Sequence, residues 1–134
     1  MTGVGRVSIG ALLATAVALA VIQPDASGVA QPPRPTADDG ASLYQAKCGS
    51  CHSIAASKIG PAHRGVFGRR AAMVPGYQYS PALRAANITW DARTLDQWLQ
   101  APQKLVKGSK MYLAVPDPRQ RDAIIRYLQS DAAK

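Results

Sequence analysis

Five consecutive residues, Cys48-Gly49-Ser50-Cys51-His52, constrain this chain more than any other feature. Two cysteines at this spacing lie on the same side of one helical turn, where each thiol can form a thioether with one vinyl group of the same haem. The histidine that follows at once can offer an imidazole nitrogen to the iron. The pattern therefore predicts one covalently attached haem c, held by Cys48 and Cys51, with His52 as the first axial ligand.

Other sites that use paired cysteines fit the chain poorly. A structural zinc site usually takes four protein ligands, and ligands at positions 51 and 52 would be awkward in a tetrahedron. The chain has two cysteines, both inside the motif, and two histidines, His52 and His63. A thioredoxin-like redox pair would need a βαβ setting, and no such pattern is visible. Haem attachment is the interpretation that remains.

The first 30 residues have the layout of a secretory signal peptide. Arg6 is the only charge before an apolar run over residues 7–22, and small residues at 28–30 offer a cleavage site. An uncleaved membrane anchor is the alternative, although the run is shorter than the roughly 20 residues that span a bilayer. We therefore expect export to the periplasm, a Pro-rich flexible segment over residues 31–37 and one folded domain over residues 38–134.

Helix signals dominate the folded part of the chain. The expected helices begin near Thr36, at Pro81, after Trp90 and at Pro118. Leu95, Trp98 and Leu99 form one apolar face at helical spacing, and Pro102 is expected to end that helix before a basic loop over residues 103–111. Since no strand alternation is visible, the sequence predicts an all-α fold of about three to five helices, with long loops wrapped around the haem.

Several further segments occur in the order and spacing of a known family. They are residues 60–61, 65–69, 75–79, 88–90, 108–111 and 121–128. With the haem motif, they make residues 39–128 resemble the class I c-type cytochromes, close to the bacterial cytochrome c2 and mitochondrial cytochrome c group. The resemblance implies a small cytochrome c fold around a single haem, and an electron carrier rather than an enzyme.

The sixth ligand of the iron has three candidates in the sequence, which are Met73, Met111 and His63. Met111 follows a glycine-containing loop that could fold back over the second haem face, and the resemblance points to the same residue. Ligation by His52 and Met111 would stabilise the reduced iron and raise its reduction potential. It would also fill both axial positions, which favours electron transfer over reaction with peroxide.

The resemblance also implies polar partners for the haem. The carbonyl of Pro61 would accept the free N–H of His52 and fix the ring. The residues expected to hydrogen-bond the haem propionates are Arg69, Tyr79 and Trp90.

Three positions depart from the family pattern. Trp98 stands where a tyrosine usually approaches the methionine sulfur, Leu113 where an aromatic ring often covers the haem edge, and Leu83 where a polar residue is usual. The resemblance therefore leaves the reduction potential and the strength of the Met111 bond open.

The chain is basic, with 16 Lys and Arg against 8 Asp and Glu and a net charge of +8. Lysines expected to border the haem edge are Lys47, Lys58, Lys104, Lys107 and Lys110. Such a ring would steer redox proteins with acidic docking surfaces. We expect a monomer in transient contact with a membrane complex, and no nucleic-acid partner because the chain is exported. The alternatives are a dedicated haem subunit or electron acceptor of one periplasmic dehydrogenase, and a small haem peroxidase.

Overall fold

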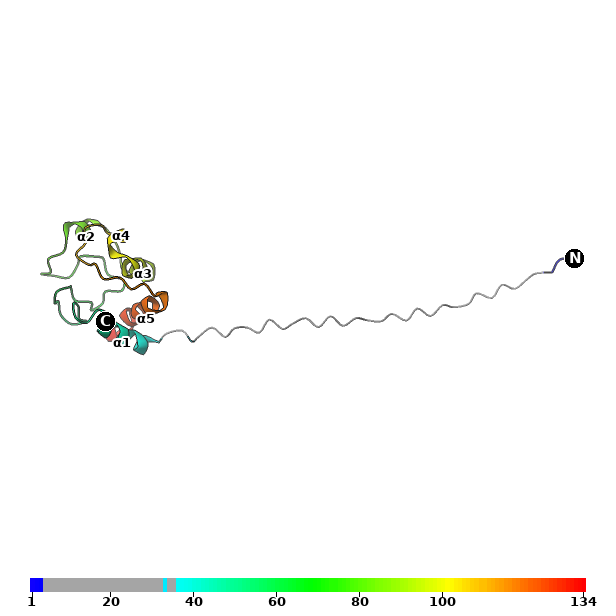
Figure 1. Ribbon diagram of the computed structural model, residues 1–134, viewed down its shortest axis with the longest axis horizontal. Coiled ribbons are helices and arrows are strands. Elements are labelled where there is room, and N and C mark those ends of the chain that lie inside the picture. The colour runs from blue at the N-terminus through cyan, green and yellow to red at the C-terminus, as the bar shows by residue number, and fades with distance from the viewer. Residues whose placement is uncertain (4–32, 34–35) are drawn as a thin grey trace. The chain divides into compact units, whose positions relative to one another are not determined.

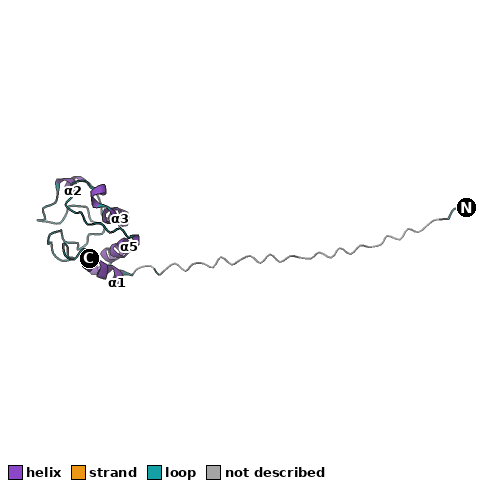
Figure 2. Cartoon of the chain, viewed as in Figure 1, coloured by secondary structure: helices purple, strands orange, loops and turns teal. Residues whose placement is uncertain are grey.

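The computed structural model describes residues 1–3, 33 and 36–134. All but the first three residues of the predicted signal peptide, and most of the predicted Pro-rich segment, lie outside these described residues. The helices are α1 (Ala37–Lys47), α2 (Pro81–Ala85), α3 (Ala92–Gln100), α4 (Pro102–Leu105) and α5 (Pro118–Gln129), followed by a short 3-10 helix, η1 (Asp131–Ala133). Long loops join α1 to α2 and α4 to α5, whereas one residue separates α3 from α4. The described residues contain no β-strand (Figures 1 and 2). The all-α prediction is confirmed.

Capping side chains set where the helices begin. The Thr36 hydroxyl accepts the N–H of Asp39, and the Asp39 carboxylate accepts the N–H of Thr36, which closes a capping box at the start of α1. Ser80 and Asp117 each accept a backbone N–H at the start of α2 and α5, where a proline fills an early helical position. These helix starts agree with the sequence-based expectation.

The helices at the two ends of this region pack against each other. α1 lies against α5, which also contacts α3 (Figure 1). Gly40 lets the backbones approach closely, since a side chain there would meet the carbonyl of Ala123, and the rings of Tyr44 and Tyr127 lie 5.2 Å apart. Fully or nearly fully buried core residues include Leu95, Leu99, Val115, Ile124, Ile125 and Leu128. This core forms one side of the cavity described below.

The segment after α3 differs from the expectation. Helix α3 ends at Gln100, as predicted, but Pro102 begins the short helix α4 where a loop was expected. Proline can do both because it stops the preceding helix and is well suited to a first helical position. A turn at Gly108, whose φ of 87° favours glycine, then leads the chain to Met111. No helix in the described part of the chain is long and apolar enough to cross a membrane.

Candidate functional site

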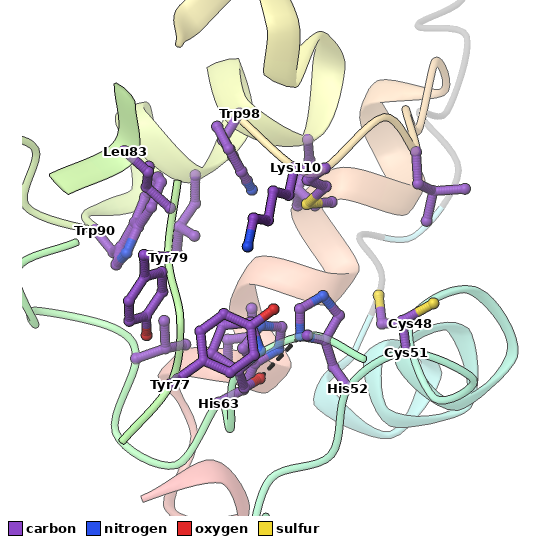
Figure 3. Close-up of a pocket in the computed structure, with 18 of the residues that line it drawn as sticks. Cys48, Cys51, His52, His63, Tyr77, Tyr79, Leu83, Trp90, Trp98 and Lys110 are labelled. Carbon is purple, nitrogen blue, oxygen red and sulfur yellow. Dashed lines mark hydrogen bonds between the residues drawn. The ribbon is translucent and has the colours of Figure 1, made fainter. Parts of the chain in front are cut away.

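A cavity of about 340 Å³ opens between the attachment motif, the loop before α2, helix α3 and the loop after α4. Figure 3 shows Cys48, Cys51 and His52 on one side of it, and Leu83, Trp90 and Trp98 on other walls. Leu95, Leu99, Ile124 and Leu128 add further apolar surface. A concave, mostly apolar site of this size suits a mostly apolar organic ligand.

The attachment motif continues directly from helix α1. The N–H groups of Cys51 and His52 both donate to the carbonyl of Cys48, at 3.0 and 2.8 Å, so the motif forms one tight turn. Cys48 is buried, Cys51 is partly buried, and both free thiols line the cavity next to each other (Figure 3). Two thiols in this position can bond to a single ligand, as thioether attachment requires.

His52 is oriented as an iron ligand needs to be. Its Nδ1 lies 2.9 Å from the carbonyl oxygen of Pro61 (Figure 3). Because a carbonyl only accepts, Nδ1 carries the proton, and the lone pair of Nε2 is free. Burial lowers the pKa of His52, although the hydrogen bond to Pro61 opposes this effect, so the ring stays neutral. Free Nε2, two thiols and apolar walls together fit a haem c.

The three candidates for the second ligand lie in different places. Met111 is partly buried and lines the same cavity as His52. Met73 is 59% exposed and is not among the lining residues. His63 lines the cavity, but its ring stacks on that of His52, with centroids 4.1 Å apart. Figure 3 shows Trp98 and Lys110, the neighbour of Met111 in sequence, across the cavity from His52.

The polar residues expected near the haem also line the cavity. Arg69 is held by hydrogen bonds from its guanidinium to the carbonyls of Arg64 and Ala62, at 2.6 and 3.1 Å. Tyr79 is buried, and its hydroxyl accepts a backbone N–H. Trp90 is buried with its ring 5.3 Å from that of Trp98. These side chains meet at one cavity although they come from three separate segments.

Only some of the five lysines predicted to surround the haem edge lie at the cavity or the attachment motif. Lys47 and Lys110 line the cavity, and the ammonium of Lys110 donates to the carbonyl of Gln78 over 2.9 Å. The ammonium of Lys58 donates to the carbonyl of Gly49, beside the attachment motif. The two remaining members, Lys104 and Lys107, are exposed but are not among the lining residues.

Two features of the site were not predicted. Gln103 hydrogen-bonds the turn that carries Met111, and His63 joins Tyr44 to His52 through a hydrogen bond and a ring stack. Burial lowers the pKa of His63 to about 3, so this ring is also neutral. The contacts of His63 join separate segments of the chain, whereas those of Gln103 reach only five to eight residues along it and depend on the shape of the turn at Gly108.

Known proteins are similar to the chain over the region that contains this site. The family model described as Cytochrome c matches residues 37–131. A cytochrome c from Cochliobolus lunatus is 35% identical over 99 residues, covering 71% of this chain and 92% of that protein. A cytochrome c2 from Rhodopila globiformis is 39% identical over 95 residues, covering 69% and 90%.

A solved structure is similar over the same region. Cytochrome cH from Methylobacterium extorquens matches with a TM-score of 0.67 and 39% identity, covering 69% of this chain and 96% of that one. The fold, the attachment motif and these matches agree with one another. The chain belongs to the cytochrome c family, and it is a single-haem electron carrier with one covalently attached haem c.

Proposed function

We propose that this chain works in the periplasm as a carrier that passes one electron at a time between redox proteins, with its iron bound by His52 and Met111. One observation carries the ligand assignment: His52, with its Nε2 free, and Met111 line the same cavity. Haem supplies a one-electron iron couple, and ligation by histidine and methionine raises its reduction potential.

Two observations favour Met111 over the other candidates. Met73 is largely exposed to solvent and does not line the cavity. His63 lies flat against His52, so it occupies the same side of the site as the first ligand, and its Nδ1 is engaged with Tyr44. Binding of the iron by both His52 and Met111 would leave no open position for peroxide, which would favour electron transfer over peroxidase chemistry.

The polar side chains at the cavity have a role in this proposal. Arg69, Tyr79 and Trp90 would hydrogen-bond the haem propionates, whose negative charge is costly to bury without partners. Arg69 is preorganised for this role by its two backbone carbonyl contacts. Trp98 would contact the Met111 side of the haem, where its N–H is the only polar group it can offer.

Substitution of Met111 by alanine tests the ligand assignment. The oxidised holoprotein should show the weak red absorption band of iron–methionine sulfur ligation, and Met111→Ala should lose it. The variant should also bind added imidazole and have a lower reduction potential, because a water or open position replaces the thioether. Met73→Ala is the matched control and should keep the band. An unchanged spectrum in Met111→Ala would rule out this ligand and reopen the peroxidase alternative.

The basic residues near the cavity support a docking role. Lys47, Lys58 and Lys110 lie at the cavity or the attachment motif, and Lys104 and Lys107 precede Met111 in sequence. They would steer an acidic redox partner to the haem edge in brief encounters. One such partner would be a membrane complex. The carrier itself would remain a monomer.

Ionic strength and charge reversal test this docking role. Electron-transfer rates with an acidic partner protein should fall steeply as salt is raised, because exposed charges are screened. Lys47→Glu, at the cavity, should lower the rate at low salt, whereas Arg93→Glu, at an exposed position of α3 that does not line the cavity, should not. Rates that do not change with salt would remove the lysine ring from the proposal.

Export is tested by the mass of the protein made in a bacterial host. Cleavage after a site near residues 28–30 and addition of one haem would change the mass of the intact chain in opposite directions. A periplasmic fraction that contains the shortened, haem-bearing chain would support the proposal. A full-length chain held in the membrane fraction would support the anchor instead.

A further inference from the structure

A second imidazole lies against the proposed iron ligand. The rings of His52 and His63 are stacked, with centroids 4.1 Å apart and planes 21° apart. Both residues line the haem cavity, and Figure 3 shows them side by side at its base. In the assignments above His63 is not an iron ligand, so this close and nearly parallel contact needs another explanation.

His63 is itself held in place. Its Nδ1 lies 3.1 Å from the hydroxyl of Tyr44, and its backbone N–H donates to the carbonyl of Ser53 over 2.9 Å. Tyr44 is 4% exposed and is packed in turn against Tyr127, where α1 meets α5. The His63 ring is thus tied, through Tyr44, to the packed helices α1 and α5.

Two other contacts restrain the His52 ring. The hydrogen bond to Pro61 fixes its Nδ1 edge, and the backbone of Gly60 lies close to its Cε1 atom. The stacked His63 ring adds a flat ring-to-ring contact, which further restricts rotation of the His52 plane about the Pro61 hydrogen bond. Second-shell groups of this kind decide the orientation of a metal-bound imidazole.

We propose that His63 is a positioning residue that fixes the plane of the His52 imidazole, and that the Tyr44 hydroxyl fixes His63. The inference rests on the proposed binding of iron by His52. The plane of an axial imidazole decides which iron d orbitals overlap its π system. It therefore influences the distribution of unpaired spin over the oxidised haem, which a residue that merely fills space would not control.

Proton NMR of the oxidised holoprotein tests this, since the hyperfine shifts of the four haem methyl groups report the spin distribution. His63→Leu removes the ring and keeps an apolar side chain, His63→Phe keeps a ring, and Tyr44→Phe removes only the hydroxyl. We expect a changed order or spread of the methyl shifts in His63→Leu, a smaller change in the same direction in Tyr44→Phe, and a pattern nearer the wild type in His63→Phe.

Tyr127→Phe is the matched control, because it deletes a hydroxyl from a ring that packs against Tyr44 and should leave the methyl shifts unchanged. Wild-type shifts in both His63→Leu and Tyr44→Phe would overturn the proposal, as would equal changes in Tyr44→Phe and Tyr127→Phe. If His63→Leu does not fold, the comparison of the haem methyl shifts of Tyr44→Phe with those of Tyr127→Phe tests the proposal by itself. His52→Ala tests the premise separately, because loss of the low-spin spectrum there shows that His52 binds the iron whatever His63 does.

Discussion

The side-chain amide of Gln103 donates from Nε2 to the backbone carbonyl of Met111 over 2.7 Å. The same nitrogen lies 2.9 Å from the carbonyl oxygen and 2.7 Å from the hydroxyl of Ser109, and the Gln103 carbonyl accepts the N–H of Gly108. One side chain of α4 therefore holds the whole turn that brings Met111 to the cavity.

Gln103→Leu should loosen this turn. Loss of several hydrogen bonds, each contributing about 1 kcal/mol, should lower the free energy of local opening by about 2 kcal/mol. The measurement is the denaturant concentration at which the red iron–methionine band disappears, which should fall more than the midpoint of global unfolding. Lys104→Ala, at the exposed neighbouring position, is the control. If the band disappears at the same denaturant concentration in Gln103→Leu as in the wild type, Gln103 does not have this role.

Gly60→Ala should disturb His52 directly. A Cβ at Gly60 would collide with the ring atoms of His52, and the backbone cannot retreat without breaking the 2.7 Å hydrogen bond from Gly60 to the carbonyl of Cys51. We expect less covalently attached haem by mass spectrometry and a weakened low-spin spectrum. Gly76→Ala is the control, since its φ of 73° costs about 1 kcal/mol but nothing lies near the added methyl. A normal spectrum in Gly60→Ala would mean that the loop can move to accommodate the methyl group without displacing His52.

Gly40→Ala should destabilise the contact between α1 and α5. The added methyl would overlap the carbonyl of Ala123 and press on the Cβ of Tyr127, and a backbone group cannot move aside as a flexible side chain can. We expect a loss of about 3 kcal/mol in the free energy of unfolding, measured by denaturant titration of the holoprotein. Ser42→Ala, at an exposed position of the same helix, should change it by less than about 0.5 kcal/mol. Equal stability of the two variants would refute the packing argument.

Arg121 should matter more to stability than a surface arginine. It is 5% exposed, its Nε lies 2.6 Å from the carboxylate of Asp96, and its Nη1 donates to the carbonyls of Val115 and Pro116. Arg121→Met leaves these acceptors without their donor, so we expect a loss of about 3 kcal/mol in the free energy of unfolding.

Arg126→Met is the comparison for that loss. Arg126 pairs with Asp122 one turn away on the partly exposed face of α5, and such a pair contributes at most about 0.5 kcal/mol. Arg121→Lys should recover little, since a single ammonium cannot reproduce the fork of the guanidinium. Similar unfolding midpoints for Arg121→Met and Arg126→Met would show that the buried contacts of Arg121 do not increase the free energy of unfolding.

Features that depend on neighbours in the chain were predictable. The turn that holds Cys48, Cys51 and His52 is set by residues within one helical turn, so their spacing alone indicates the attachment chemistry. Caps such as Ser80 and Asp117 act on backbone N–H groups two or three residues away, and they located helix starts correctly. Pro102 misled the prediction only because one proline both ended a helix and began the next.

The sequence by itself thus determined the cofactor, the all-α class and the family, because these depend on short-range patterns and on their order. Only the tertiary structure decided that His63 stacks on His52, and that the loop after α4 places Met111, the candidate that the resemblance favoured, at the cavity of His52. Each of these placements depends on the paths of long loops over the cavity. Those paths result from the packing of the whole core, which no local pattern of residues encodes.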